Sequence, residues 1–356
     1  MQSIKKKIRV MIVDDSLLAR RIIRDGLSAY SNMEIVGEAG NAAEARAKLP
    51  LLRPDVMTLD VEMPGMNGID FVKSLLPQHP VPIILVSSLN LRVFDAMAVG
   101  AVDFVRKPET VGANQRFIEA LANKIVVASC ARIRRSQMAA APAVGRLPLM
   151  AQGVKETIIA IGASTGGTEA TLEVIKRLPA DTPGIVVVQH MPPGFTKMYA
   201  DRLDKICAMK VKEAENGDAI ERGRVLIAPG DKQMRVVRTG NRYTVSCQFG
   251  EKVSGHCPSV AKQWAYSKGM SLDVLSHSVA QSFRCRTVGI ILTGMGRDGA
   301  DGLLDMRRHG AYTIGQDKES SVVYGMPMVA HDIGAVVQQA ACENIAAVLL
   351  RHLNNA

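Results

Sequence analysis

Short apolar runs alternate with amphipathic segments along the first 125 residues of the chain. The apolar runs cover residues 8–13, 34–38, 55–59, 83–86 and 103–105. Helix-like segments lie between them, for example at residues 16–30 and 42–49. Five such alternations are typical of an open parallel sheet with helices on both faces. The pattern therefore predicts a doubly wound α/β domain over residues 1–125.

The same alternation returns in the second half of the chain. Its apolar runs are 157–161, 184–189, 224–228, 288–293 and 312–315, and helical patterns occur at 168–178 and 302–308. Residues 126–153 differ, because they hold four arginines and two prolines and lie in a stretch without acidic residues from Ala120 to Lys155. This composition predicts a linker. We expect residues 154–356 to form a second, Rossmann-like domain, so the predicted fold class is α/β with two doubly wound parallel-sheet domains.

Composition narrows the class of protein. The formal net charge is +10, but aromatic residues make up only 4%, which argues against a stacking surface for nucleic acid. The six cysteines are scattered and form no CxxC pair, so reduced thiols are expected rather than disulfides or a zinc site. No apolar stretch approaches the length of about 18 residues that indicates a membrane span. We expect a soluble, cytoplasmic protein that neither binds nucleic acid nor inserts into a membrane.

Acidic residues follow two of the predicted strands in the first domain. Asp14 and Asp15 come after the first strand, and Asp60 comes after the third. Ser87 and Lys107 stand at the ends of the fourth and fifth. Each acid alone could cap a helix or decorate a turn, but ligand crevices in open parallel sheets lie at the carboxyl ends of the strands. Together the five predict a Mg²⁺ site that accepts a phosphoryl group.

A glycine-flanked serine follows the first strand of the second domain. The run Gly162-Ala-Ser164-Thr-Gly166 fits the G-x-S-x-G pattern of a strand–turn–helix nucleophile. Glycines permit the tight turn, and the next helix offers backbone N–H groups for an oxyanion. A phosphate-binding or merely tight turn is the alternative at this point.

Two further residues favour the interpretation of Ser164 as a nucleophile. His190 ends the run 184–189, and Asp298 lies in a glycine-rich loop after the run 288–293. Asp301 and Asp305 are weaker candidates for the acid because they are expected in or beside the next helix, whereas a helix cap is the alternative role for Asp298. Serine, histidine and aspartate at one sheet edge predict a triad, in an order that differs from the Ser-Asp-His of α/β-hydrolases.

The first domain resembles the flavodoxin-like response-regulator receiver family. The resemblance rests on Val13-Asp-Asp-Ser16, Thr58-Leu-Asp-Val-Glu-Met-Pro-Gly65, Val86-Ser-Ser88 and Val105-Arg-Lys-Pro108. It implies that Asp60 is the phosphoacceptor for a histidine kinase. It also implies a switch formed by Ser87 and Phe104 with Lys107, and Mg²⁺ ligands from Asp14, Asp15, Asp60 and the backbone carbonyl of Glu62. The segment 88–100 is a few residues shorter than is usual in the esterase family.

The second domain resembles the catalytic domain of chemotaxis protein-glutamate methylesterases. The resemblance rests on Ile161-Gly-Ala-Ser-Thr-Gly-Gly167, Gln189-His-Met-Pro-Pro193, Leu292-Thr-Gly-Met-Gly-Arg-Asp-Gly299 and a further run from Gln316 to Pro327. It implies a Ser164 nucleophile, a His190 base and an orienting Asp298, with Thr165 and Met295 near the oxyanion. It also implies methylated chemoreceptors as substrates, deamidation of glutamines, and no cofactor for the esterase reaction.

One departure from the family pattern stands out. The family reads Pro-Ser-Val-Asp-Val-Leu without a break, whereas here Pro258-Ser-Val260 and Asp273-Val-Leu275 are separated. We therefore expect a 12-residue insertion at 261–272. Two other functions stay open at this point, namely a DNA-binding regulator and an adaptor that binds receptors without catalysis. The first lacks helix-turn-helix signals, and the intact Ser, His and Asp argue against the second.

Overall fold

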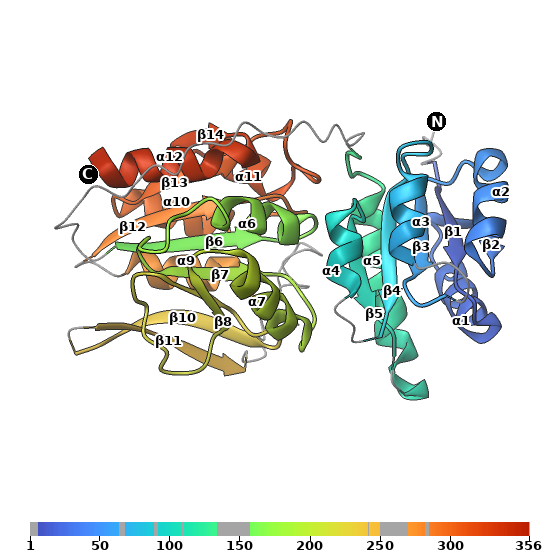
Figure 1. Cartoon of the computed structure of the whole chain (residues 1–356), viewed down its shortest axis with the longest axis horizontal. Coiled ribbons are helices and arrows are strands. Elements are labelled where there is room, and N and C mark those ends of the chain that lie inside the picture. Colours follow the sequence, from blue (N-terminus) through green and yellow to red (C-terminus); the bar gives the residue numbers. More distant parts are fainter. Residues whose placement is uncertain are drawn as a thin grey trace. The chain divides into compact units, whose positions relative to one another are not determined.

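The computed structural model describes residues 6–63, 68–88, 92–108, 110–133, 157–240, 242–249, 270–281 and 285–355. The chain divides into two compact units, residues 1–138 and 139–356. Figure 1 shows the first unit in blue to teal and the second in green to red. Each unit is built on its own parallel sheet.

The first unit is a five-stranded parallel sheet in the order β2-β1-β3-β4-β5, which is the flavodoxin-like order. Its strands are β1 (Ile8–Val13), β2 (Met33–Ala39), β3 (Val56–Asp60), β4 (Ile83–Ser87) and β5 (Asp103–Arg106). Its helices are α1 (Leu17–Ser28), α2 (Ala42–Leu52), α3 (Gly68–Leu75), α4 (Arg92–Ala98), η1 (Val111–Ala113) and α5 (Asn114–Ala128). The predicted fold class is confirmed.

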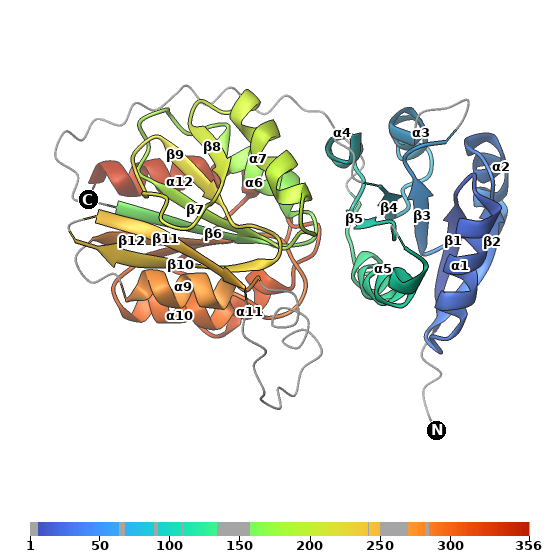
Figure 2. The same ribbon diagram turned by 90° about the horizontal axis from the view of Figure 1, so that it is seen from below.

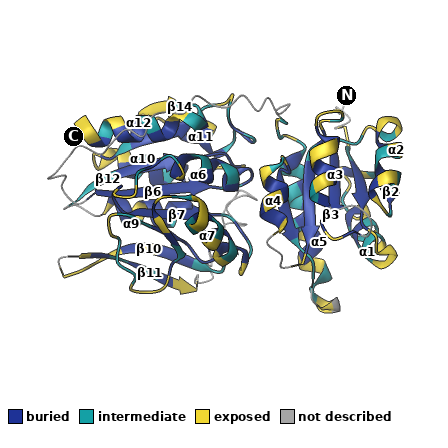
Figure 3. Cartoon of the chain, in the orientation of Figure 1, coloured by how far each residue is buried: buried dark blue, intermediate teal, exposed yellow. Residues whose placement is uncertain are grey.

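Burial explains why the strands could be read from the sequence. All five residues of β3 and all five of β4 are buried, because helices cover both faces of the sheet. Figure 3 shows the strands in dark blue and the outer sides of the helices in yellow. The helix starts carry recognisable caps, since Ser16 accepts from the Ala19 N–H at α1 and Asn41 from the Glu44 N–H at α2.

The second unit is a seven-stranded parallel sheet in the order β14-β13-β12-β6-β7-β9-β8. Its strands are β6 (Thr157–Ala163), β7 (Ile185–Gln189), β8 (Lys210–Glu213), β9 (Arg224–Ile227), β12 (Arg286–Ile291), β13 (Tyr312–Gln316) and β14 (Gln338–Ala340). Its helices are α6 (Gly167–Ile175), α7 (Phe195–Ile206), α9 (Leu272–Ala280), α10 (Ala300–Arg308), α11 (Met326–Asp332) and α12 (Cys342–Asn355).

An antiparallel hairpin, β10 (Lys232–Thr239) and β11 (Arg242–Phe249), adds to one face of this sheet. Figure 2 shows α6, α7 and α12 on one side and α9, α10 and the hairpin on the other. Met234, Val236 and Val245 of the hairpin belong to the same buried cluster as residues of the sheet, α9 and α10. The sequence predicted neither this hairpin nor the edge strands β8 and β14.

The described residues cover only part of the predicted linker and of the segment 88–100. Helix α5 runs to Ala128, three residues past the expected end of the first domain, and residues 134–153 of the expected linker lie outside the described residues. In the segment 88–100, α4 has seven residues, while residues 89–91 are outside the described ranges. None of the helices in the described part of the chain combines the length and apolar character needed to cross a membrane.

Candidate functional site

Three carboxylates gather at the carboxyl edge of the first sheet. Asp14 and Asp60 are buried, whereas Asp15 is exposed, and one oxygen from each lies within 4.8 Å of the other two. Lys107 reaches in from the end of β5, with its Nζ 2.9 Å from Asp14 Oδ2 and 2.7 Å from Asp60 Oδ2. The structure thus brings together four of the residues that the sequence assigned to a phosphoryl site.

The electrostatics of this cluster fit a divalent cation. Burial raises the pKa of the Asp60 carboxyl, although hydrogen bonds from Lys107 and from the Glu62 N–H oppose the rise. Burial lowers the pKa of Lys107, but its bonds to Asp60 and Asp14 outweigh this and raise it. One ammonium does not balance three carboxylates, and hard oxygen ligands at this spacing suit Mg²⁺. The residues present therefore fit the expected ion, while a ligand role for the Glu62 carbonyl stays a prediction.

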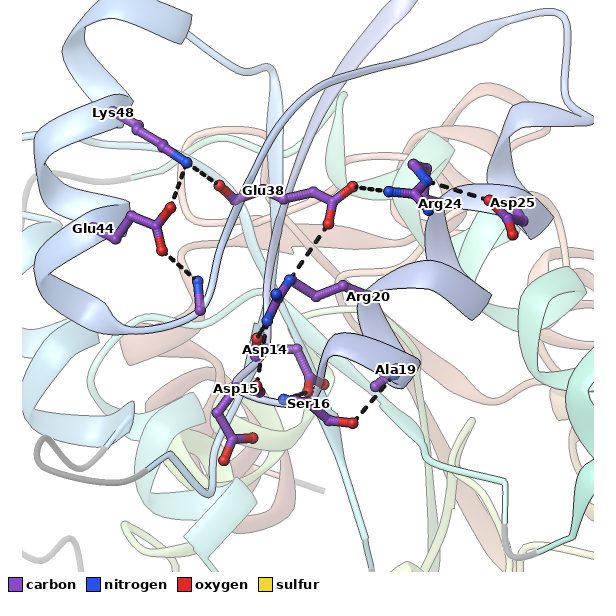
Figure 4. A network of polar contacts seen from close by, with 11 residues as sticks. Asp14, Asp15, Ser16, Ala19, Arg20, Arg24, Asp25, Glu38, Glu44 and Lys48 are labelled. Carbon is purple, nitrogen blue, oxygen red and sulfur yellow. Dashed lines mark hydrogen bonds and ion pairs between the residues drawn. The ribbon is translucent and has the colours of Figure 1, made fainter.

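The loop that carries the acids is braced from behind. Figure 4 shows Arg20 of α1 between this loop and Glu38 of β2. Its Nη1 donates to the carbonyl oxygens of Asp14 at 2.7 Å and Asp15 at 3.3 Å, and its Nε lies 3.4 Å from Glu38 Oε2. A half-buried arginine of this kind fixes the backbone and leaves the carboxylates to face the site.

The expected switch residues lie on β4 and β5, the two strands that follow β3 in the sheet. Ser87 ends β4 and is fully buried, and its Oγ has no hydrogen-bond partner among the described residues. Phe104 of β5 is buried against Phe94, with ring centroids 6.1 Å apart in an edge-to-face arrangement. A buried hydroxyl without a partner beside Asp60 is an observation that a phosphoryl oxygen would explain. The switch role of the pair stays a prediction.

Ser164, His190 and Asp298 form one chain of hydrogen bonds in the second unit. His190 Nδ1 lies 3.2 Å from Ser164 Oγ, and His190 Nε2 lies 2.9 Å from Asp298 Oδ2. The three residues follow β6, β7 and β12, which are neighbours in the sheet. Because a carboxylate only accepts, Nε2 carries the proton and Nδ1 is free to take the serine proton. Nucleophile, base and orienting acid are placed as a triad requires.

Asp298 is held by the helix that faces it. Its Oδ1 accepts from the Ser271 hydroxyl at 2.8 Å and the Asp273 N–H at 3.2 Å, and its Oδ2 accepts from the Leu272 N–H at 2.9 Å as well as from His190. Burial by itself raises the pKa of Asp298, but these donors outweigh burial and hold it below the ordinary value. The carboxylate is therefore fixed and ionised.

The contacts around Asp298 also bear on the alternatives weighed for the acid. Gly299 is the N-cap residue of α10, and no side-chain hydrogen bond caps this helix, so Asp298 does not cap the helix that follows it. Asp301 pairs with Arg297 instead, and Asp305 pairs with His277. Asp298 is the acid that lies against His190, with its Oδ2 2.9 Å from the histidine Nε2.

The turn that carries the nucleophile is anchored on both sides. The Ser164 N–H donates to Thr293 O at 3.0 Å, and the Thr293 hydroxyl donates to Thr165 O at 3.0 Å. Gln189 Nε2 donates to Ser164 O at 2.8 Å. Gly166 has φ +77°, and a Cβ there would lie 2.6 Å from Val322 Cβ. The turn is thus locked, and glycine is required in it.

The two residues expected near the oxyanion differ in exposure. Thr165 is buried, whereas Met295 is 42% exposed. Met295 follows Gly294, whose position is so close to Ser164 that an added Cβ would lie 2.7 Å from the serine Cβ. Ser164 also lies three residues before α6, whose N-terminus favours negative charge. Both residues therefore border the nucleophile, and their part in an oxyanion site stays a prediction.

Sequence reasoning missed three residues that hold the triad, namely Gln189, Ser271 and Thr293. Gln189 and Thr293 lie inside the quoted motifs, and their position at strand ends was the available signal. Ser271 was assigned to the insertion expected at 261–272. It caps α9 instead, and Ser271-Leu-Asp-Val-Leu275 repeats the family spacing of Ser, Asp, Val and Leu without a break. Residues 261–269 of the expected insertion lie outside the described residues, so the insertion itself stays a prediction.

Comparison with known proteins decides the family. Residues 159–349 match the family model for CheB methylesterase, and residues 10–120 match that for the response regulator receiver domain. A Syntrophomonas wolfei protein named protein-glutamate methylesterase/protein-glutamine glutaminase 2 is 48% identical over 353 residues, which is 98% of each chain. The chain belongs to the CheB methylesterase family. This confirms the resemblance read from the sequence.

Other members of the CheB methylesterase family are also close to this chain. A Syntrophotalea carbinolica protein-glutamate methylesterase/protein-glutamine glutaminase is 45% identical over 351 residues, 96% of each chain. The catalytic domain of Thermotoga maritima CheB methylesterase, a crystal structure, is 34% identical with a TM-score of 0.49, and the match covers 56% of this chain and 98% of that one. The segment matched by the CheB family model contains Ser164, His190 and Asp298, and the receiver segment contains Asp14, Asp15, Asp60 and Lys107.

Proposed function

We propose that this chain hydrolyses γ-methyl esters of glutamate side chains on chemoreceptors, under control of phosphorylation at Asp60. The observation that carries the proposal is the chain of hydrogen bonds from Ser164 through His190 to Asp298 at one sheet edge. The names of the relatives supply the ester class. The receiver match and the acid cluster support the phosphorylation control.

The first half of the reaction forms an acyl-enzyme. His190 Nδ1 takes the proton from Ser164 Oγ as that oxygen attacks the γ-carbonyl carbon of the methylated glutamate. The carbonyl oxygen becomes an oxyanion beside the N-terminus of α6, near Thr165 and Met295. The protonated His190 then gives its proton to the methoxy oxygen, and methanol leaves.

The second half returns the free enzyme. His190 Nδ1 takes a proton from water, whose oxygen attacks the acyl carbon, and the same proton then goes back to Ser164 Oγ as the ester bond breaks. Asp298 stays ionised throughout and keeps the imidazole in the tautomer that has Nδ1 free. A glutamine side chain would follow the same steps with ammonia as the leaving group, so the proposal includes deamidation.

Control by the receiver follows from the first cluster. A histidine kinase is the phosphodonor, and Asp60 accepts the phosphoryl group with Asp14, Asp15 and Glu62 as the residues that would hold Mg²⁺. The bound ion would neutralise the charge of the carboxylates and the phosphoryl oxygens. Lys107 pairs with Asp60 now and is placed to pair with the phosphoryl group, while Ser87 offers its hydroxyl.

Methanol release from methylated receptor membranes tests the proposal, with and without a small phosphodonor and Mg²⁺. We expect release that increases with the phosphodonor and disappears in Ser164→Ala. Release that ignores the phosphodonor would leave the esterase and remove the control. No release under either condition would contradict the esterase itself and favour an adaptor that only binds receptors.

A further inference from the structure

The carboxylate of Asp298 has no remaining capacity to accept a hydrogen bond. An ionised carboxylate offers about four lone-pair positions, and four donors fill them, two on each oxygen. One donor is His190, and the other three come from the first residues of α9, namely the Ser271 hydroxyl and the backbone N–H groups of Leu272 and Asp273. Protonating Asp298 would therefore break at least one of these bonds.

Backbone N–H groups near the N-terminus of each of the helices α9 and α10 donate to an aspartate that belongs to, or precedes, the other helix. Asp298, which precedes α10, accepts from the start of α9, and Asp273, in the first turn of α9, accepts from the Gly302 N–H of α10 at 2.7 Å. Carboxylates at helix N-termini are stabilised by the free N–H groups and the helix dipole. Because of these reciprocal hydrogen bonds, the position of Asp298 depends on the packing of α9 on α10.

Ser271 differs from Leu272 and Asp273 because it contacts Asp298 through its side chain and not through its backbone N–H. Its hydroxyl accepts from the Val274 N–H at 3.4 Å as the cap of α9 and donates its single proton to Asp298 Oδ1 at 2.8 Å. It is 1% exposed, so water does not replace it. The cap needs only an acceptor, whereas the contact with Asp298 needs a donor.

We propose that Ser271 is a positioning residue of the triad, which orients Asp298 by donating to Oδ1 so that Oδ2 faces His190. The inference rests on the proposed esterase function and adds a fourth side chain to its machinery. Ser271 touches neither substrate nor nucleophile, and it acts through the carboxylate alone. Loss of the Ser271 hydroxyl should therefore lower kcat and leave KM nearly unchanged.

Substitutions at Ser271 in the full-length chain separate this role from helix capping. Ser271→Thr keeps the donor and the acceptor, and we expect kcat within about threefold of the parent. Ser271→Ala removes both, and we expect kcat to fall about 10- to 100-fold, as for other groups that orient a catalytic ligand. Ser271→Asp keeps a cap as good as serine but places an acceptor against Asp298, and we expect a loss of more than about 100-fold.

Ser278→Ala is the matched control. Ser278 lies on the same helix, donates to Leu275 O and accepts from the Val236 N–H, so its loss disturbs α9 without touching Asp298. We expect similar loss of thermal stability in Ser278→Ala and Ser271→Ala, but a loss of kcat only in the second. Equal kcat values in the two alanine variants, or full activity in a folded Ser271→Asp, would overturn the proposal.

The rate at which a serine-reactive phosphonate labels Ser164 gives a second measurement that needs no receptor. We expect labelling rates to follow the same order, Ser and Thr above Ala above Asp. If the parent labels but releases no methanol, the proposed function fails while the labelling order still decides the role of Ser271. If the parent neither labels nor releases methanol, it has no working triad, and both proposals are overturned.

Discussion

Asp60 and Asp298 are both buried carboxylates at the carboxyl edge of a parallel sheet, yet their surroundings are opposite. Asp60 has one backbone donor and shares a single ammonium with Asp14, and its pKa is raised by burial. Asp298 has four donors, and they outweigh burial to hold its pKa low. Position in the fold therefore does not decide the chemistry of an acid, whereas the number of donors around it does.

The difference suits the two proposed tasks. An acid that accepts a phosphoryl group needs an oxygen that can leave its present partner, and Lys107 is a mobile cation that can follow the phosphoryl group. An acid that orients a base must keep one geometry through every turnover, and backbone N–H groups at a helix start do not move independently. The contacts of Asp60 can therefore be exchanged when a phosphoryl group arrives, whereas the contacts of Asp298 stay the same throughout the reaction.

Removing the nucleophile separates the two sites most completely. In Ser164→Ala we expect esterase turnover to fall by at least about 10⁴-fold, because the hydroxyl that contacts His190 Nδ1 is removed. Phosphorylation of Asp60 should be unaffected. The measurements are methanol release and incorporation of label from a radioactive phosphodonor, and turnover close to the parent value would contradict the assignment.

Substituting asparagine for Asp298 and for Asp60, one at a time, tests the contrast between the two carboxylates. Asp298→Asn replaces an acceptor of the His190 proton with an amide, and we expect kcat to fall about 10³- to 10⁴-fold through loss of the correct tautomer. Asp60→Asn should leave basal kcat unchanged and abolish the response to the phosphodonor. A normal phosphodonor response in Asp60→Asn would show that the acceptor lies elsewhere.

The hydroxyl of Thr293 is expected to matter less than the triad. Thr293→Val keeps the shape but removes the bridge between Thr165 O and the Val323 backbone. We expect kcat to fall about 10- to 100-fold and unfolding to become easier by about 1–3 kcal/mol, since buried polar groups lose their partner. Thr293→Ser, which keeps the hydroxyl, is the control and should stay close to the parent in kinetic and denaturant measurements.

The smallest effect concerns Asp273. Burial and the charge of Asp298 raise its pKa to about 6, so its contribution to stability is complete below pH about 4 and is lost as pH rises through 6. Asp273→Asn keeps an acceptor for the Gly302 N–H and removes the charge. We expect the variant to gain on the order of 1–3 kcal/mol over the parent above pH 6 and nothing below pH 4. Thermal melting from pH 4 to 8 measures this, and a constant difference across that range would contradict it.

Much of the fold and both sites could be predicted from the sequence. Strands such as β1 and β7 are nearly continuous apolar runs because both faces of a parallel strand are buried. Ser164, His190 and Asp298 were found because each directly follows or closely trails such a run. The alternating apolar and polar residues of the hairpin β10–β11 are typical of half-buried strands. The hairpin was missed because its core partners lie far away in the sequence.

The residues that hold the triad were harder to predict for a physical reason. Ser271 contacts Asp298 across 27 positions and Gln189 contacts Ser164 across 25, through bonds whose geometry depends on packed helices and loops. The sequence around a single serine or glutamine does not predict such a contact.

The position of β6 in the sheet also governs how the enzyme is made. β6 pairs on one side with β7, which follows after a single helix, but on the other side Gly162 pairs with Ile291. A chain emerging from the ribosome thus carries serine and histidine long before its acid exists. One side of β6 therefore stays open to mispairing until β12 has been synthesised. If the proposed triad is correct, a nascent chain that lacks β12 also lacks the acid of that triad.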